Sequence, residues 1–293
     1  MRFCILTHNT ASHFVNRAAR SFEKLGHKAE VVDFADVRFS VRDGAVRIGF
    51  NNDGADIAST FDACLARPLG KKDLSAFMFS INVLSVLSQN GLTVVNNPDA
   101  YLLASSKLSQ YLVLSDHGLP VPSTESSLDA AELLKSAPGG ACLIEKPICG
   151  SRGVGIRRVR AGLGPHRAPR AVVLYQQDLT GAGTDIRAFT VGHRVVAAMK
   201  RVSSSLAANV SRGGRPERVE LDDELVHLAE DASRATGAEI AGTDIMLDRS
   251  GRSYILEVNA QPDFIGLETV ADVDISSTIC EYMIERVVGR GDA

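Results

Sequence analysis

Two polar side chains, Glu257 and Asn259, interrupt an apolar run that otherwise has the pattern of a buried strand over residues 253–259. Side chains alternate across a strand, so these two lie on the same face. A carboxylate on a half-buried face is costly in free energy unless a cation lies beside it. The pattern therefore predicts a cationic partner for Glu257.

A second acid lies opposite in the hairpin that this strand forms with the preceding one. With residue 248 opposite residue 253, Asp244 faces Glu257 with Cβ atoms about 5 Å apart. These two carboxylates and the Asn259 amide are hard oxygen ligands, which suit Mg²⁺ rather than Zn²⁺, and Mg²⁺ usually shares its carboxylates with substrate phosphates. The alternative is an arginine or lysine that pairs with both acids.

A lysine, Lys146, and the glycine-rich segment 150–155 indicate a phosphate-binding hairpin. The segment lacks the lysine position of a P-loop, and a strand pattern rather than a helix pattern follows it, unlike a dinucleotide-binding fingerprint. The lysine precedes the loop, so backbone N–H groups of the loop could contact phosphates that Lys146 neutralises. The alternative is an ordinary surface hairpin.

Positive charge is concentrated around this loop. Residues 146–177 hold one Lys and six Arg and no Asp or Glu, in a chain of net charge −3. Such a run is either a solvated loop or a local field that attracts a polyanion. A further lysine, Lys107, lies on the apolar stripe of a helix predicted over 98–117, where it either extends to water or reaches a buried anion.

The elements around these residues alternate between strand and helix patterns in the first third of the chain, which predicts an open, parallel α/β sheet. The strand and helix patterns in the rest of the chain predict an α+β fold. We expect three domains, 1–96, 97–175 and 176–293. Strand or hairpin patterns occupy 2–8, 28–34, 39–50, 62–70, 92–96, 141–148, 155–160, 171–179, 185–202 and 240–259, and helix patterns occupy 12–25, 73–90, 98–117, 129–136, 222–236 and 274–288.

Composition excludes several classes of protein. A chain of 293 residues with 45% hydrophobic and 23% charged residues is globular and not disordered. The net charge of −3 argues against a nucleic-acid or membrane-surface binder. Five scattered cysteines without ligand spacing, no signal peptide and no long apolar segment predict a cytoplasmic protein. Association into a homo-oligomer is compatible with the sequence.

Five segments, taken in chain order, resemble the ATP-grasp superfamily and its RimK-type glutamate-ligase branch across roughly residues 94–285. They are NNPDAYLLASSKLSQYLVLSDHGLPVPST, EKPICGSRGVGI, YQQDLTGAGTDIRAFTVG, NVSRGG and AGTDIMLDRSGRSYILEVNAQP. The resemblance implies an N-terminal open α/β domain, a central lid domain and a C-terminal α+β domain, with ATP held between two antiparallel sheets.

The resemblance also implies the reaction. Members of this family are ADP-forming ligases that phosphorylate a carboxylate with ATP and let an amine attack the acyl phosphate, which produces an amide or peptide bond. The partners expected here are ATP, an amino acid, which we take as L-glutamate, and an acidic acceptor such as a pterin- or furan-type one-carbon cofactor or a protein tail. The expected cofactor is Mg²⁺ as two ions, with Mn²⁺ as an alternative.

Carried over position by position, the resemblance implies the site residues. The ATP-binding residues are Lys107, Lys146, Ser151, Gly153, Gly155, Gln177, Asp178, Leu179 and Asp185. The metal ligands are Asp244, Glu257 and Asn259, the catalytic residues are Arg212, Arg201 and Lys146, and the substrate residues are Arg67, Arg187, Asn209 and Arg212. Arg67 belongs to the RPLG segment before the resembling region.

Three positions depart from the family pattern. Ala207 and Ala208 precede the NVSRGG segment where an arginine is common, Asp263 follows the EVNAQP segment where a glycine is usual, and Asp178 replaces a common glutamate. The first two fall near the substrate side, so they affect the identity of the substrates more than the use of ATP. A ligase of another amino acid, or one similar to dipeptide or glutathione synthetases, stays an alternative, as does a non-catalytic nucleotide-binding regulatory protein.

Overall fold

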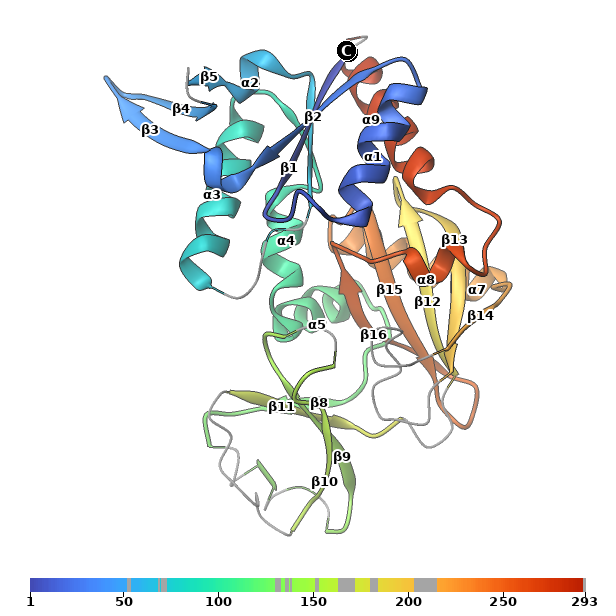
Figure 1. Ribbon diagram of the computed structural model, residues 1–293. Coiled ribbons are helices and arrows are strands. Elements are labelled where there is room, and N and C mark those ends of the chain that lie inside the picture. The colour runs from blue at the N-terminus through green and yellow to red at the C-terminus, as the bar shows by residue number, and fades with distance from the viewer. Residues whose placement is uncertain are drawn as a thin grey trace.

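The N-terminal sheet has the strand order β2-β1-β6-β7 with all strands parallel (Figure 1). Its strands are β1 (Arg2–Thr7), β2 (Lys28–Asp33), β6 (Ala63–Ala66) and β7 (Thr93–Val95), and the predicted open α/β sheet is confirmed. Here and below, the computed structural model describes residues 1–51, 54–67, 69, 73–129, 133–134, 137, 139–150, 153–162, 172–179, 184–202 and 215–291, with the backbone alone at 184, 290 and 291. Among the described residues no helix has the length and apolarity to cross a bilayer.

Both faces of this sheet are buried, which is why its strands are nearly continuous apolar runs. Phe3 and Ile5 pack against α1 (His13–Lys24) and α9 (Ile275–Gly291), while Cys4 and Leu6 face α3 (Leu74–Gln89). The C-terminal helix α9 returns to the start of the chain and lies beside α1 (Figure 1). The first and last segments of the sequence therefore share one core.

A smaller antiparallel sheet, β3-β4-β5, extends from this part of the molecule. It is preceded by η1 (Phe34–Asp36) and consists of β3 (Arg38–Arg42), β4 (Ala45–Phe50) and β5 (Ala55–Asp56), followed by α2 (Ile57–Thr60). Asp43 and Gly44 both have positive φ, 50° and 77°, as a two-residue type I′ turn requires. The predicted hairpin through these two residues is confirmed.

The single helix predicted over 98–117 is wrong, because the chain forms two helices, α4 (Pro98–Ala104) and α5 (Lys107–Asp116). Ser106 caps α5 by accepting a hydrogen bond from the Ser109 N–H at 3.3 Å, and such a side-chain cap competes with a continuous helix. Lys107 is consequently the first residue of α5 rather than a residue in the middle of a long stripe.

The middle sheet is antiparallel with the order β10-β9-β11-β8. Its strands are β8 (Thr124–Ser126), β9 (Cys142–Pro147), β10 (Arg157–Arg160) and β11 (Val173–Gln177). Gly155 has a φ of 80°, and a Cβ at this position would lie 2.9 Å from the Pro147 side chain, so only glycine fits there. Most of the helix predicted over 129–136 lies outside the described residues.

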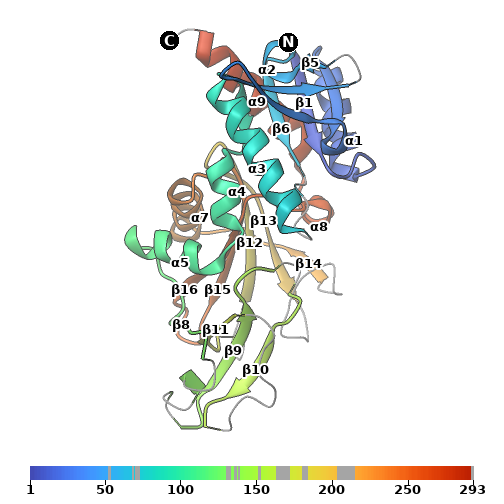
Figure 2. The same cartoon turned by 90° about the vertical axis from the view of Figure 1, so that its left-hand side faces the viewer.

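The C-terminal sheet is antiparallel with the order β14-β13-β12-β15-β16 and lies between the N-terminal sheet and the middle sheet along the molecule (Figure 2). Its strands are β12 (Thr184–Val191), β13 (Arg194–Val202), β14 (Arg215–Arg218), β15 (Ile240–Leu247) and β16 (Ser253–Asn259), and α7 (Asp223–Ala235) packs against it.

The hairpin β15–β16 pairs Asp244 with Glu257 as predicted, but its tip differs. Ser253 lies opposite Leu247 and not opposite Asp248, so the predicted register at the loop is wrong by one residue. A register shift next to Ile245 inserts an extra residue on β16, which restores the predicted pairing at the acids. The Tyr111 hydroxyl of α5 donates to the carbonyl of that extra residue, Leu256, at 2.8 Å.

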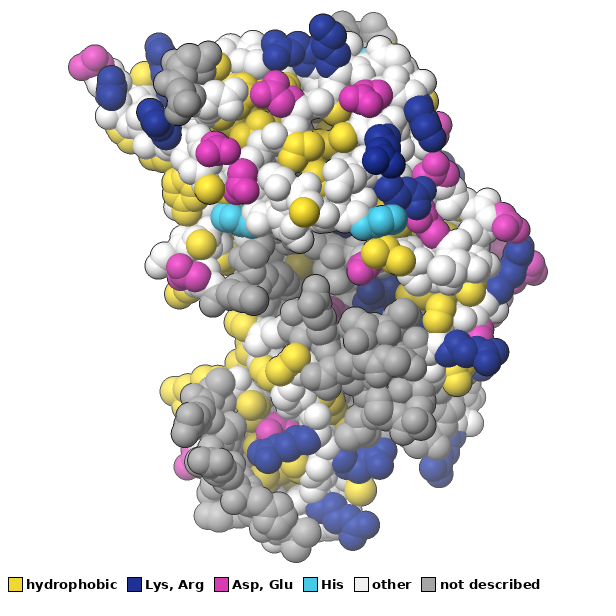
Figure 3. All heavy atoms as spheres, viewed as in Figure 1, with side chains coloured by type: hydrophobic (Ala, Val, Ile, Leu, Met, Phe, Trp, Pro, Cys, Tyr) yellow, Lys and Arg dark blue, Asp and Glu magenta, His cyan; other side chains and the backbone are white. Residues whose placement is uncertain are grey.

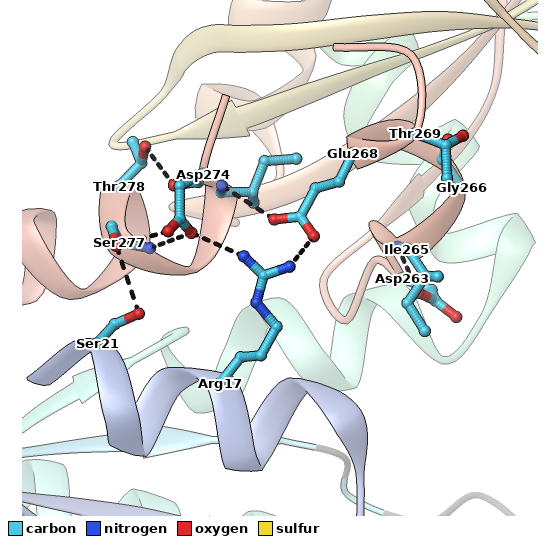
Figure 4. Close-up of polar contacts among 11 residues, drawn as sticks. Arg17, Ser21, Asp263, Ile265, Gly266, Glu268, Thr269, Asp274, Ser277 and Thr278 are labelled. Carbon is cyan, nitrogen blue, oxygen red and sulfur yellow. Dashed lines mark hydrogen bonds and ion pairs between the residues drawn. The ribbon is translucent and has the colours of Figure 1, made fainter. Parts of the chain in front are cut away.

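A polar cluster joins α1 to the segment that contains α8 (Ile265–Glu268) (Figure 4). The Arg17 guanidinium lies between Glu268 and Asp274 and donates to both, with 3.0 Å to Asp274 Oδ1. Asp274 also caps the start of α9 by accepting from the Ser277 N–H at 3.1 Å. Residues more than 250 positions apart thus hold the N-terminal and C-terminal segments together.

Candidate active site

One face of the C-terminal sheet carries the charged side chains that the sequence singled out. Asp185 and Arg187 alternate along β12, Asp244 pairs with both Arg187 and Glu257 across the sheet, and Arg201 of β13 lies opposite Asp185. Because alternate residues of neighbouring strands share one face, these five side chains form one surface.

Asp244 is held by two arginines. Arg187 binds it through both carboxylate oxygens, at 2.7 and 2.8 Å, and Arg201 contacts it at 3.0 Å while also donating to Asp185 at 2.5 Å. Burial alone would raise the pKa of Asp244, but Arg187 and Arg201 outweigh it and lower that pKa to about 2. Burial raises the pKa of Asp185 against the attraction of Arg201.

Glu257 has a different partner. The ammonium group of Lys107 lies 3.7 Å from its carboxylate and donates to the Gly150 carbonyl at 3.3 Å. Lys107 is therefore not extended into water but reaches the half-buried carboxylate of Glu257, which is nearer to the second of the two outcomes expected of it. Because Lys107 contacts both Gly150, at the start of the glycine-rich segment, and Glu257 of β16, its positive charge lies between the middle sheet and the C-terminal sheet.

Lys146 reaches the same region from the middle sheet. It is 8% exposed, and its ammonium group donates to the Gln176 side chain at 2.5 Å. Burial lowers the pKa of Lys146 to about 8, although Glu257 partly opposes that shift. Two lysines from different elements, Lys107 and Lys146, thus converge near Glu257, as a phosphate-binding pair requires.

The predicted magnesium ligands have the chemistry for the ion but are engaged by protein groups. Asn259 Oδ1 accepts from the Gln261 N–H at 2.9 Å, and both Asp244 oxygens accept from arginines. Asn259 Oδ1 and Asp244 Oδ1 each keep a further lone pair, whereas Asp244 Oδ2 faces both Arg187 and Arg201, at 2.8 and 3.0 Å. Among the described residues Glu257 meets a cation only at 3.7 Å. Asp244, Glu257 and Asn259 together fit a Mg²⁺ ion that is coordinated in part by phosphate oxygens. A cluster of three or more His, Cys, Asp or Glu with metal-ligand geometry does not occur in the described part.

Three of the expected ATP-binding residues, Gln177, Asp178 and Leu179, lie where β11 ends. Gln177 is exposed and its N–H donates to the Ser123 carbonyl at 2.9 Å, while Leu179 is buried. Asp178 accepts from Arg158 of β10 at 2.6 Å. The ion pair joins the basic strand of the middle sheet to this turn, and Lys and Arg side chains are visible on the surface of this sheet (Figure 3).

The glycine-rich loop is described in part. Gly153 and Gly155, in the second half of the loop, have φ of 66° and 80°, whereas Ser151 lies outside the described residues. Asn209 and Arg212 also lie outside them, as do Ala207 and Ala208.

Arg67 follows β6 and is 5% exposed. One nitrogen, Nη2, donates to the Pro262 carbonyl at 2.5 Å, and the guanidinium lies 4.3 Å from the Phe14 ring centre. The other nitrogen, Nη1, has no hydrogen-bond partner among the residues that the structure describes. Burial lowers the pKa of Arg67 to about 10, and Asp263 is among the groups that oppose that shift. Arg67 therefore lies beside the segment that follows Asn259, with one unsatisfied donor.

Two site residues, Gln176 and Tyr111, were not predicted. Gln176 donates to the Tyr111 hydroxyl at 2.9 Å and to Thr124 at 3.1 Å while it accepts from Lys146. The signal for Gln176 was present, because a polar side chain at the end of the apolar run VVLYQ is the same kind of anomaly as Glu257 in its strand. Tyr111 carried no signal, because a tyrosine on an apolar helix face is ordinary.

Comparison with known proteins agrees with this geometry. The RimK-like ATP-grasp domain family matches residues 104–283. A probable alpha-L-glutamate ligase 2 of Hahella chejuensis is 28% identical over 299 residues, which cover 98% of this chain and 97% of that protein. The tetrahydromethanopterin:alpha-L-glutamate ligase of Methanosarcina acetivorans is 29% identical over 265 residues, which cover 78% of this chain and 82% of that protein.

A solved structure shares the whole architecture. The ATP-grasp ligase PsnB, complexed with a phosphomimetic variant of its minimal precursor, Mg and ADP, superposes with a TM-score of 0.74 at 26% identity, covering 97% of this chain and 98% of that one. The family match spans more than half of the sequence. This chain therefore belongs to the RimK-like ATP-grasp family of carboxylate–amine ligases.

Proposed function

We propose that this ligase uses ATP and Mg²⁺ to join the amine of L-glutamate to the carboxylate of an acidic acceptor through an acyl phosphate. The observation that carries the proposal is the convergence of Lys107 and Lys146 on the face that holds Asp244 and Glu257. Glutamate enters from the names of the relatives, several of which are alpha-L-glutamate ligases. We take residues 97–175 as the lid that covers the nucleotide.

Within this proposal Lys107 and Lys146 bind the phosphates of ATP, and Gln177, Asp178 and Leu179 border the adenine. Asp244, Glu257 and Asn259 would hold Mg²⁺, as two ions that share Glu257 or with Mn²⁺ as a substitute. The metal would neutralise phosphate charge and polarise the γ-phosphoryl group. Arg187 and Arg201, which fix Asp244, keep that carboxylate ionised and in position.

The reaction needs positioning and charge stabilisation more than covalent catalysis. An acceptor carboxylate oxygen bonds to the γ-phosphorus while ADP leaves, and the glutamate nitrogen then attacks the acyl carbon while phosphate leaves and the amine loses a proton. We assign Arg212 and Asn209 to the acyl-phosphate side and Arg67 to a substrate carboxylate. The unsatisfied Nη1 of Arg67 supports its assignment.

Two features bear on the acceptor and the compartment. Asp263 adds negative charge near Arg67, which favours a ligase of another amino acid as the second candidate. Cys4 and Cys64 face each other across β1 and β6 as free thiols, which supports a reducing compartment and hence the cytoplasm. The acceptor class proposed is an acidic cofactor, a pterin- or furan-type one-carbon carrier, or a protein tail.

The test is ADP release by purified protein with ATP, Mg²⁺, glutamate and a broad carboxylate panel, followed by mass spectrometry. The expected result is glutamate-dependent ADP formation and a product heavier by one glutamyl group. Matched control reactions contain lysine or aspartate in place of glutamate. A product with another increment would favour the second candidate, and ATP binding without turnover for any carboxylate would contradict the ligase assignment of the site.

A further inference from the structure

The small sheet β3-β4-β5 ends in an uncovered edge. Strand β3 is the last strand in the sheet order, and the hairpin β3–β4 projects from the N-terminal part of the molecule, away from the C-terminal sheet (Figure 1). An edge strand presents unpaired backbone groups that can pair with another extended chain. This hairpin is therefore a potential docking surface that the proposed reaction does not use.

The turn geometry identifies the free backbone groups. A two-residue turn makes Arg42 and Ala45 a hydrogen-bonded pair, and hydrogen-bonded pairs alternate along an antiparallel ladder. Phe39 and Val41 therefore belong to the pairs whose N–H and C=O groups point away from β4. Among the described residues, these outward N–H and C=O groups of Phe39 and Val41 have no hydrogen-bond partner.

The side chains on this edge are apolar on one face and basic on the other. Phe39 and Val41 share a face and are 40% and 63% exposed. Arg38 and Arg42 lie on the opposite face, where Arg47 is diagonal to both because it pairs with Ser40. Like charges at this spacing repel one another.

Those three arginines have no ion pair with any described residue. From Arg38 to Phe50 the only acid is Asp43, which lies in the turn. Figure 3 shows the basic and apolar side chains on the projecting hairpin. The edge thus combines free backbone groups, two exposed apolar side chains and uncompensated positive charge.

We propose that strand β3 docks an extended, acidic segment of a partner polypeptide, which adds a fourth strand to the sheet β3-β4-β5. Backbone pairing supplies affinity, and alternate side chains of the added strand supply specificity. Charge favours this occupant over a second copy of the chain, because antiparallel pairing of two β3 strands sets Arg38 of one copy near Arg42 of the other.

The first test removes one outward N–H. A fluorescein-labelled peptide of alternating glutamate and valine serves as the probe in fluorescence anisotropy, with a lysine–valine peptide as the charge control. Val41→Pro deletes the Val41 N–H without removing a bond to β4 and is expected to weaken binding about five- to tenfold, since one hydrogen bond contributes about 1 kcal/mol. Val41→Thr keeps that N–H and is expected to retain binding within about twofold.

The second test reverses the charge. The double variant Arg42→Glu, Arg47→Glu is expected to weaken the glutamate–valine peptide about tenfold at low salt and to strengthen the lysine–valine peptide. Wild-type binding should also weaken as salt rises. Equal binding of both peptides, or binding indifferent to Val41→Pro, overturns the proposal.

Sedimentation of the wild-type protein tests the remaining alternative, in which a second copy of the chain occupies the edge of β3. A dimer that Val41→Pro converts to a monomer identifies a second copy as the partner and overturns the acidic-segment proposal, whereas a wild-type monomer that binds the glutamate–valine peptide supports it. ADP formation with a small carboxylate should be unchanged by Val41→Pro. Failure of peptide docking is thus distinguishable from failure of the proposed reaction.

Discussion

At the scale of single residues, the two facing acids have different cationic partners. Asp244 is bound by Arg187 and Arg201 at hydrogen-bond distance, whereas Glu257 has Lys107 at 3.7 Å. Among the described residues no single arginine or lysine pairs with both acids, so the predicted alternative of one bridging side chain does not occur there, and the metal assignment stays a prediction. Because the cation nearest to Glu257 is farther away than the arginines that bind Asp244, Glu257 is the better candidate to contact an added cation.

The first prediction concerns the variant Glu257→Gln. Loss of a carboxylate that would hold Mg²⁺ is expected to reduce ADP formation by about tenfold to a hundredfold or more. The free energy of unfolding should change by less than about 1 kcal/mol, because the lost partner is a lysine at 3.7 Å and the Glu257 side chain is 27% exposed. Coupled-enzyme kinetics and urea unfolding provide the two measurements.

The control for this variant is Glu224→Gln, which removes an exposed acid in the first turn of α7. It should leave activity unchanged. Full activity in Glu257→Gln would show that the metal assignment is wrong.

The second prediction follows from the pKa of Lys146, which burial lowers to about 8 in the free protein. A bound phosphate favours the charged ammonium and raises that pKa, so ATP binding takes up a proton above pH 8. ATP affinity should be constant below pH 7.5 and should fall above pH 8 by up to about tenfold for each pH unit. Titration calorimetry in buffers of different ionisation enthalpy measures both the ATP affinity and the number of protons taken up on binding.

The control here is Lys146→Arg, because a guanidinium stays charged throughout this range. The affinity of that variant for ATP should not depend on pH between 7.5 and 9.5. The same pH dependence in both proteins would assign the titration to another group.

At the scale of elements, the bulge on β16 is held by α5. The Tyr111 hydroxyl donates to the Leu256 carbonyl and accepts from Gln176, and the Val258 N–H donates to the Gln110 side chain at 2.7 Å. Helix α5 thereby fixes the strand on both sides of Glu257. It also fixes Gln176, the partner of Lys146.

The third prediction is that Tyr111→Phe destabilises the protein by about 1–3 kcal/mol, since the half-buried Leu256 carbonyl and the buried Gln176 amide each lose a partner. Urea unfolding measures the change. The matched variant is Tyr254→Phe. Among the described residues the Tyr254 hydroxyl meets only Arg252, at 3.5 Å in an exposed contact, so this variant should change stability by less than about 0.5 kcal/mol. Equal effects of the two variants would contradict a special role for the Tyr111 hydroxyl.

At the scale of the whole molecule, the site lies between sheets from three parts of the chain, so their relative positions matter. Arg17 of α1 joins Glu268 and Asp274, which lie just after the segment that Arg67 contacts (Figure 4). Both arginines thus attach the N-terminal sheet to the chain that follows Asn259. Their contacts fix the position of this segment relative to α1 and β6.

The fourth prediction is that Arg17→Gln lowers the free energy of unfolding by about 1 kcal/mol at low salt and by less at high salt, because the Arg17 side chain is 32% exposed and its ion pairs are partly screened. The control is Arg20→Gln on the same helix, because Arg20 is exposed and forms no ion pair with a described residue. An equal loss of stability in the two variants would show that the cluster contributes nothing specific.

The sequence by itself determined the features that depend on neighbours in the chain. The parallel N-terminal sheet follows from alternating elements, the hairpin at Asp43 from its turn residues, and the pairing of Asp244 with Glu257 from a short hairpin. In the two hairpins the interacting residues are joined by few intervening positions, so local geometry restricts the outcome. Even there a one-residue error at the loop was cancelled by a bulge that only packing against Tyr111 reveals.

Tertiary structure alone decided which cation binds which acid. Lys107 reaches Glu257 from 150 positions away, and Arg67 reaches Pro262 from 195 positions away. The break between α4 and α5 belongs with these contacts, because it makes Lys107 the first residue of α5. Such contacts depend on how three sheets pack together, and periodicity along the chain carries no information about distance between separate elements.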